Sequence, residues 1–211
     1  NGDSRMDLLV ADAVHNLIAV VTNRGNGSFV LATNYPVGSG PRSVTAADFG
    51  RGAVDIVAAN YNVSSLTVLT NNGAGVFGSN ITYTLTGSPQ VVIAADVNGD
   101  NKLDLIAAIQ GSAVVAVLTN KGNGTFLLSS NYNLGVASPF KLDAVDLNGD
   151  HALDLVVADS YNNQLFVLTN NGDGNFTLEP SYPVRNGLSG FAVLDADDNG
   201  SPDLAGASYM N

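Results

Sequence analysis

A repeat of about 49 residues runs through the whole chain and restricts its fold more than any other feature. The acidic stretch DVNGDNKLDLIAAI starts at Asp96, DLNGDHALDLVVAD at Asp146 and DADDNGSPDLAGAS at Asp195, and weaker copies stand at the N-terminus and from Asp48. The last Asp of each copy recurs at intervals of 48 to 50 residues. A second motif, Asn-x-Gly-x-Gly-x-Phe, keeps the same period and ends at Phe29, Phe77, Phe126 and Phe176. Two independent motifs in register predict a repeat architecture.

Each repeat is typical of four short strands. In the clearest copy they cover residues 90–97, 104–109 and 113–120, and the fourth starts at Phe126. Four strands in 40–50 residues are the arithmetic of a β-propeller blade, whereas a β-solenoid has shorter turns and a tandem of sandwiches has longer units. With 23 glycines and only 13% charged residues, the composition disfavours helices. We therefore expect an all-β fold, a β-propeller of four-stranded antiparallel blades with about four to five blades in this chain.

The 211 residues are expected to form a single propeller region. Its repeats are placed at residues 1–41, 42–89, 90–139, 140–190 and, in part, 191–211. The chain then holds five second strands but only four first, third and fourth strands, which does not close a ring simply. Open blades expose strand edges that can pair with another chain. We expect either a fragment of a larger propeller or a protomer that completes its ring as a homo-oligomer.

Three acidic loops carry oxygen side chains at positions 1, 3, 5 and 9. Alternate positions of a tight loop can turn toward one centre, and oxygen ligands without His or Cys favour Ca²⁺. Position 7 would contribute its backbone carbonyl, so its residue type is free to vary. The alternative is that these residues cap turns without any metal. The predicted ligands are Asp96, Asn98, Asp100, Lys102 and Asp104; Asp146, Asn148, Asp150, Ala152 and Asp154; and Asp195, Asp197, Asn199, Ser201 and Asp203.

The two weaker copies are expected to differ. In the second repeat the loop is one residue shorter and Gly50 and Gly52 replace oxygen side chains, so no calcium is assigned to Asp48 and Asp55. At the N-terminus, Asn1, Asp3 and Asp7 match positions 3, 5 and 9 and form a partial metal site.

Taken together, Asp-x-Asn-Gly-Asp-x-x-x-Asp followed by an apolar strand, and Asn-x-Gly-x-Gly-x-Phe about 20 residues later, resemble the FG-GAP/VCBS repeat family over essentially the whole chain. That family includes the integrin α-subunit head and many secreted bacterial proteins. The resemblance implies a calcium-binding propeller, commonly seven-bladed, that is secreted or displayed on the cell surface. It also implies roles in recognition and adhesion, with some lectins among the relatives.

Other classes of function find little support in the residues. The net charge is −11 and the eight Lys and Arg are scattered, so nucleic acid is not an expected partner. The chain has no cysteine and no apolar run long enough to span a membrane, which excludes disulfides and gives no reason to expect membrane insertion. His15 and His151 are expected in turns, and the acidic pairs are better explained by calcium than by glycosidase chemistry. We expect no enzymatic activity.

Ligand contacts are expected in the turn after each second strand, which varies between repeats. Tyr61, Tyr161 and Tyr209 lie there beside or near Asn, and each could stack on a sugar ring or anchor a peptide. Exposed turn tyrosines without a partner are the alternative. The expected partner is an extracellular protein or glycan. A lectin, or a scaffold domain of a secreted polysaccharide-degrading enzyme, is the alternative function.

Overall fold

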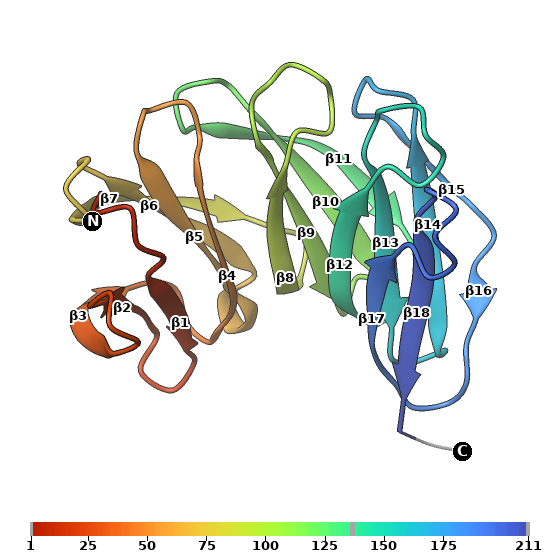
Figure 1. Cartoon of the computed structure of the whole chain (residues 1–211), viewed down its shortest axis with the longest axis horizontal. Coiled ribbons are helices and arrows are strands. Elements are labelled where there is room, and N and C mark those ends of the chain that lie inside the picture. The colour runs from red at the N-terminus through yellow and green to blue at the C-terminus, as the bar shows by residue number, and fades with distance from the viewer. Residues whose placement is uncertain (1, 136–137, 210–211) are drawn as a thin grey trace.

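The computed structural model describes residues 2–135 and 138–209, which form five antiparallel sheets arranged along an arc (Figure 1). We call the sheets blades 1 to 5. Blade 1 contains β1 (Leu8–Asp12), β2 (Leu17–Asn23) and β3 (Phe29–Pro36). Blade 2 contains β4 (Pro41–Asp48), β5 (Val54–Asn60), β6 (Ser65–Asn71) and β7 (Phe77–Thr84), with the short 3-10 helix η1 (Tyr61–Val63) between β5 and β6.

The remaining blades continue the same pattern. Blade 3 contains β8 (Ser88–Ala95), β9 (Asp104–Gln110), β10 (Val114–Asn120) and β11 (Phe126–Asn133). Blade 4 contains β12 (Pro139–Val145), β13 (Asp154–Asp159), β14 (Gln164–Asn170), β15 (Phe176–Leu178) and β16 (Tyr182–Pro183). Blade 5 contains β17 (Leu188–Leu194) and β18 (Asp203–Ser208).

Within each blade, every strand pairs with the next one along the chain, except at the outer strand of blade 4. In blade 2, for example, Thr45 of β4 faces Val57 of β5, which faces Val68 of β6. The outer strand of blade 4 is divided into β15 and β16, both paired with β14. Pro180 stands between them and has no backbone N–H to give to the ladder. The predicted all-β fold of four-stranded blades is confirmed, and the sheets do not close into a ring.

The core lies between neighbouring blades, because the second strand of each inner blade is buried on both faces. Ile56 of β5 packs toward blade 1, while Val57 packs toward blade 3 in a cluster with Leu105 and Ala107. The next interface repeats this arrangement with Ile106 of β9 and other residues of blades 3 and 4. Burying one such aliphatic side chain contributes about 1.5–3 kcal/mol. The continuous apolar runs in the sequence are therefore strands enclosed by two neighbouring sheets.

The strand pattern places all turns of one type at the same end of the blades. The loops from first to second strands and the Asn-x-Gly-x-Gly turns share one rim, and the turns after the second strands lie on the opposite rim. At the turn after β10, Gly122 and Gly124 have φ of +86° and +74°, which favour glycine. None of the described helices has the length and apolar character that a membrane span requires.

Candidate metal centres in the acidic loops

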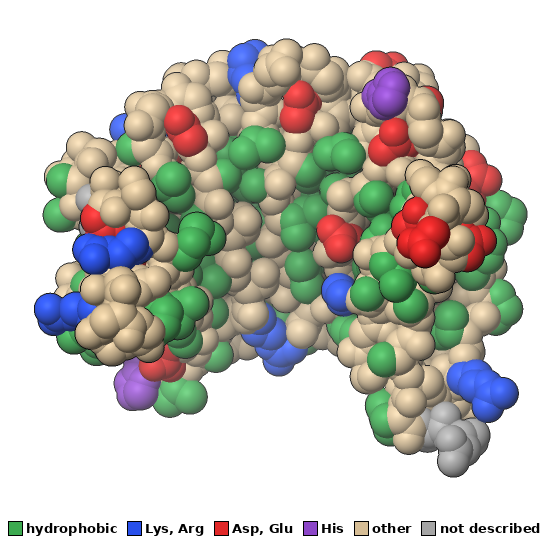
Figure 2. All heavy atoms as spheres, viewed as in Figure 1, with side chains coloured by type: hydrophobic (Ala, Val, Ile, Leu, Met, Phe, Trp, Pro, Cys, Tyr) green, Lys and Arg blue, Asp and Glu red, His purple; other side chains and the backbone are tan. Residues whose placement is uncertain are grey.

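Four acidic loops connect the first and second strands of blades 2 to 5. We call them loops 2 to 5 after their blades, and they cover residues 48–55, 96–104, 146–154 and 195–203. Loops 2 to 4 lie along the upper edge of the arc in Figure 1, and acidic side chains are visible on this rim in Figure 2.

The Asp at position 1 folds each loop back on itself. In loop 3, the Asp96 carboxylate accepts hydrogen bonds from the backbone N–H groups of Gly99 (2.9 Å) and Asn101 (2.7 Å). Asp146 accepts the equivalent pair in loop 4, and Asp195 accepts the N–H groups of Asn199 and Gly200 in loop 5. The alternative that these Asp residues cap turns is thus correct for position 1. Capping does not prevent the same carboxylate from binding an ion, since each carboxylate oxygen has a second lone pair.

The side chains at positions 3 and 5 also cap the loop. Asn98 accepts the N–H of Asp100 at 3.0 Å, and Asp100 accepts the N–H of Lys102 at 3.0 Å. The Lys102 ammonium donates to the other Asp100 oxygen at 2.9 Å, and this hydrogen bond lowers the pKa of Asp100. Loop 4 repeats the two backbone bonds through Asn148 and Asp150, with Ala152 in place of Lys102. In loop 5 the same pattern includes the bond from Ser201 N–H to Asn199.

The Asp at position 9 is buried at the base of the loop. One Asp104 oxygen accepts the N–H of Asn120 from the third strand at 2.8 Å, and the other faces the N–H of Val97 at 3.4 Å. Asp154 makes the same two contacts with Asn170 and Leu147. Burial raises the pKa of the Asp104 carboxyl, although both N–H groups favour its ionised form. Position 9 therefore ties the loop to its own blade, a role that the sequence analysis did not assign.

The loops differ in how closely their carboxylates gather. In loop 5, one carboxylate oxygen from each of Asp195, Asp197 and Asp203 lies within 4.8 Å of the others. Across residues 2–135 and 138–209, no other group of three His or acidic residues meets this distance. In loops 3 and 4 the predicted ligands therefore share a loop, but their carboxylates lie farther apart than those of loop 5. An all-oxygen donor set of this kind fits a hard cation such as Ca²⁺.

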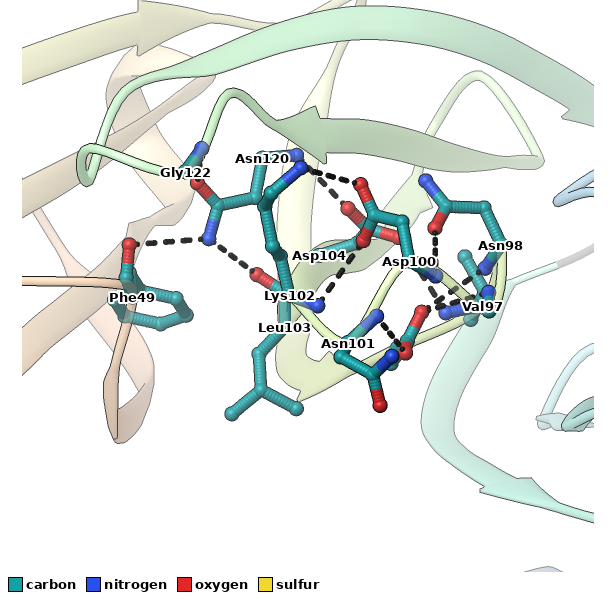
Figure 3. A network of polar contacts seen from close by, with 12 residues as sticks. Phe49, Val97, Asn98, Asp100, Asn101, Lys102, Leu103, Asp104, Asn120 and Gly122 are labelled. Carbon is teal, nitrogen blue, oxygen red and sulfur yellow. Dashed lines mark hydrogen bonds and ion pairs between the residues drawn. The ribbon is translucent and has the colours of Figure 1, made fainter.

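Loops 2 and 3 also reach the following blade. The Asn120 side chain in blade 3 donates to Leu103 O in its own blade at 3.0 Å and to Phe49 O in loop 2 at 3.3 Å (Figure 3). In blade 4, Asn170 repeats this bridge to Leu153 O and to Val97 O in loop 3, at 3.0 and 2.7 Å. In blades 3 and 4, the first Asn of the Asn-x-Gly-x-Gly motif thus joins neighbouring blades at the rim that carries the loops.

Loop 2 keeps the turn but lacks most of the candidate ligands. Asp48 accepts three backbone N–H bonds, from Gly50, Arg51 and Gly52, and that from Arg51 contributes most to lowering its pKa. Asp55 accepts the N–H of Asn71 at 2.7 Å, while its other oxygen is buried without a hydrogen-bond partner among the described residues. The nearest cation is Arg51, with Nε 3.8 Å from that oxygen, and burial raises the pKa of Asp55.

The N-terminal partial site is engaged by other groups. Asp3 forms an ion pair with Arg5 at 2.6 Å, and Arg5 also donates to Arg24 O. Asp7 accepts the N–H of Asn23 at 2.8 Å, which is the position-9 contact of the other blades. Asn1 lies outside the described residues.

The three candidate ligand-binding tyrosines have different environments. Tyr61 is partly buried: its hydroxyl donates to Gln110 of blade 3 at 2.8 Å, and the Arg42 guanidinium lies 3.5 Å from its ring centroid. Tyr161 is 69% exposed and Tyr209 is 73% exposed. The structure thus leaves Tyr161 and Tyr209 open to solvent and uses Tyr61 to hold blades 2 and 3 together.

The two histidines lie in turns, as the sequence predicts. The His15 ring lies 2.7 Å from an Asp12 oxygen, and His151 lies on loop 4 with Nδ1 3.9 Å from Asp146. His151 lines a shallow cavity of about 270 Å³ between loops 3 and 4, together with Asp96, Asp150 and Asn171. A second shallow cavity, of about 480 Å³, lies between blades 1 and 2 and is lined by residues such as Pro36, Val63 and Thr67.

The sequence matches the FG-GAP-like repeat in four consecutive segments, residues 1–51, 50–107, 96–157 and 146–206. A comparison with curated protein sequences finds no match.

Solved structures with a similar fold include several β-propellers. A protein from Lactobacillus plantarum is 17% identical with a TM-score of 0.69, and the similarity covers 98% of this chain and 63% of that one. BBS1N, solved in complex with ARL6DN, is 13% identical with a TM-score of 0.64, covering 90% and 56%. A 6-phosphogluconolactonase-like protein from Bacteroides uniformis is 12% identical with a TM-score of 0.65, covering 94% and 66%. The chain spans only part of each, and the likeness concerns the fold alone.

Proposed function

The chain belongs to the FG-GAP-like repeat family, and on that premise we propose that it is a calcium-stabilised, non-catalytic propeller module for recognition or adhesion outside the cell. The observation that carries the proposal is loop 5, where Asp195, Asp197 and Asp203 bring three carboxylates within 4.8 Å of one another. Unneutralised carboxylates at this spacing repel one another, and a divalent cation turns that repulsion into attraction.

Calcium has a structural role in this proposal. In loops 2 to 4, position 9 is hydrogen-bonded to the third strand of its own blade, and the backbone beside position 1 of loops 2 and 3 accepts a bond from the next blade. An ion that orders such a loop therefore also steadies the joint between two blades. Extracellular modules bind calcium with dissociation constants of roughly 10⁻⁴–10⁻³ M, so the ion supply outside cells suits this role.

The proposed ligand face is the rim opposite the acidic loops. Tyr161 follows the second strand of blade 4 and Tyr209 follows that of blade 5, and both rings are largely exposed. Asn162, which follows Tyr161, can add hydrogen bonds to a stacked ring or an anchored peptide. This combination also suits a glycan, so a lectin is the second candidate. A glycan array with wild type and Tyr161→Ala separates a lectin from a protein-binding module, because a lectin shows sugar selectivity that the variant loses.

The calcium part is tested by thermal unfolding of the full chain with calcium and with chelator. We expect calcium to raise Tm, and Asp197→Asn to reduce the increase. Asp198→Asn is the matched control, since it removes one charge from the same loop at a position not proposed as a ligand and keeps a positive φ that Asn tolerates. Equal Tm values with calcium and chelator contradict the proposal, and so does an equal loss in both variants.

A further inference from the structure

The cavity between blades 1 and 2 is lined by an unusual group of hydroxyl side chains. It has a volume of about 480 Å³ and lies at the rim opposite the acidic loops, where the segment that joins β3 to β4 meets the turn after β5. Small-molecule sites usually have volumes of roughly 300–1,000 Å³. The four hydroxyls come from Ser65 and Thr67 of β6 and from Thr82 and Thr84 of β7.

These hydroxyls form two cross-strand pairs. Ser65 faces Thr84, and Thr67 faces Thr82 on the neighbouring strand. Ser65 and Thr67 are 4% and 3% exposed and form the floor of the cavity, whereas Thr82 and Thr84 are exposed and form one wall. The pairs therefore place four hydrogen-bonding groups around one small space.

A buried amide holds the two floor hydroxyls. The Asn60 side chain is fully buried, and its Nδ2 donates to Ser65 Oγ at 3.1 Å and to Thr67 Oγ1 at 2.8 Å. A hydroxyl that accepts such a bond still has its own hydrogen to donate. Neither hydroxyl hydrogen finds an acceptor among the described residues. Asn60 thus leaves Ser65 and Thr67 able to donate to a group that enters the cavity.

Asn60 itself has an unused acceptor beside the cavity. Its Oδ1 is buried without a hydrogen-bond partner among the described residues. The amide lies against Gly38, which lines the cavity, and a Cβ added at Gly38 would stand only 2.7 Å from Asn60 Cγ and Nδ2. Buried polar atoms in proteins are rarely left unpaired unless a water or a ligand supplies the bond. The unpaired atom therefore favours a polar occupant.

The next joint is apolar at the same positions. In blade 3, the places of Asn60, Ser65 and Thr67 are taken by residues that pack in the core between blades 2 and 3. These residues are Ile109, Val114 and Ala116. Burying polar side chains costs free energy unless they are hydrogen-bonded, so the repeat alone gives no reason for the polar set in blade 2. A binding role for this one joint accounts for the departure.

The rest of the cavity is apolar and uncharged. Pro36 and Val37 border it from the end of blade 1, and Val63, which is 49% exposed, borders it from η1. None of the described residues that line it carries a charge, and the chain as a whole has a net charge of −11. A neutral ligand with hydroxyls on its edge and C–H groups on its faces matches this lining.

We propose that the cavity between blades 1 and 2 binds a single neutral sugar ring. Sugar oxygens accept hydrogen bonds from Ser65 and Thr67, the hydroxyls of Thr82 and Thr84 contact the ring edge, and the ring face packs on Val63. This inference names a ligand class and a place for the lectin function proposed above and rests on that proposal to this extent. It needs neither calcium nor Tyr161.

Titration of the full chain with neutral monosaccharides, followed by saturation-transfer-difference NMR, tests the proposal. The probes are glucose, galactose, mannose and N-acetylglucosamine, with glucuronic acid as the charged comparison. We expect saturable binding of at least one neutral sugar and weaker binding of glucuronic acid. Thr67→Val removes one floor hydroxyl at nearly constant shape and should raise Kd about five- to tenfold, while Thr82→Val should raise it about two- to threefold.

Thr177→Val is the matched control, because it removes an exposed hydroxyl from the outer strand of blade 4 and should leave Kd unchanged. If circular dichroism shows that Thr67→Val disturbs the fold, Thr82→Val still tests the wall, since its side chain is exposed. A Kd that rises in Thr82→Val and stays constant in Thr177→Val then supports the site.

Two results overturn the proposal. One is the absence of saturable binding by every neutral sugar up to about 100 mM, which would leave the cavity to water. The other is sugar binding that Tyr161→Ala abolishes and both cavity variants retain, which would place the sugar at Tyr161 and keep the lectin function without this site. Binding that the cavity variants weaken and Tyr161→Ala retains supports the cavity and removes Tyr161 from the sugar contact.

Discussion

Loops 2 and 3 occupy the same place in adjacent blades and differ in what they can hold. Both start with an Asp that accepts backbone N–H bonds and end with a buried Asp that accepts an N–H from the third strand. Loop 3 adds Asn98 and Asp100 between them, where loop 2 has glycines and Arg51. The two outer Asp residues therefore suffice to form the turn, and the positions between them decide whether oxygen ligands are present. Substitutions in the two loops can separate these two roles.

The largest difference is expected from removal of the buried Asp. Asp104→Ala leaves the N–H groups of Asn120 and Val97 without acceptors, and each unpaired buried group costs about 1–3 kcal/mol. We expect a loss of about 2–4 kcal/mol in the free energy of unfolding, measured with urea in chelator. Asp55→Ala strands one N–H and also removes a buried carboxylate, so its cost should be smaller. Equal costs would show that the second contact of Asp104 contributes nothing.

A smaller effect is expected at the joint between the loops and the next blade. Asn120→Ala removes the bridge to Phe49 O and Leu103 O and should cost about 1–2 kcal/mol in urea unfolding. Asn71 donates to Val54 O of its own blade, and the described residues show no bond from it to the preceding blade. Asn71→Ala should therefore cost less. If Asn71→Ala costs as much as Asn120→Ala, the bridge between the blades is not a source of stability.

The pH dependence of loop 2 follows from its buried acid. Burial raises the pKa of Asp55 above the ordinary value of about 3.9, so its contribution to stability is present at low pH and is lost as pH rises through the raised pKa. Asp55→Asn removes this titration. Between about pH 4 and pH 7 the wild type should lose stability relative to the variant as the pH rises, measured by urea unfolding at each pH. If the difference in free energy of unfolding between the two proteins stays constant over this range, Asp55 does not titrate with a raised pKa.

The smallest effect is expected for Arg51. Its guanidinium is partly exposed and 3.8 Å from Asp55, so Arg51→Gln should cost less than about 1 kcal/mol at pH 7. Because Arg51 favours the ionised carboxylate, the variant should also show a steeper loss of stability with rising pH. Arg185→Gln removes an exposed charge between β16 and β17 and should change neither quantity. The same pH profile in all three proteins would exclude an electrostatic role for Arg51.

The repeat itself made the fold predictable. A continuous apolar run such as residues 104–109 is typical of a strand buried on both faces, and Leu105 and Ile106 do pack toward opposite blades. The Gly-x-Gly spacing is typical of a hairpin turn, since positive φ is a local property of the chain. These features depend on the sequence within one repeat.

Contacts between repeats were not predictable in the same way. The retention of Asp55 in a loop without other ligands was a usable signal that position 9 holds the blade together. The fixed spacing of six residues from Phe126 to Tyr132, repeated in every outer strand, was the signal of the edge-to-face contact that Tyr132 makes with Phe176 of the next blade. The bond of Tyr61 to Gln110 depends on how the neighbouring blade is placed, which no local pattern specifies. The ion pair of Lys102 with Asp100 lies within one loop, but it depends on the direction of the lysine side chain, which the sequence also leaves open.

Isothermal titration calorimetry of the metal-free chain with calcium is the sharpest test of whether loops 3 to 5 bind the ion and loop 2 does not. We expect heat of binding with one ion for each of loops 3, 4 and 5, and a stoichiometry that Asp55→Asn in loop 2 leaves unchanged. Absence of binding heat, or a stoichiometry that falls when loop 2 is altered, would contradict it.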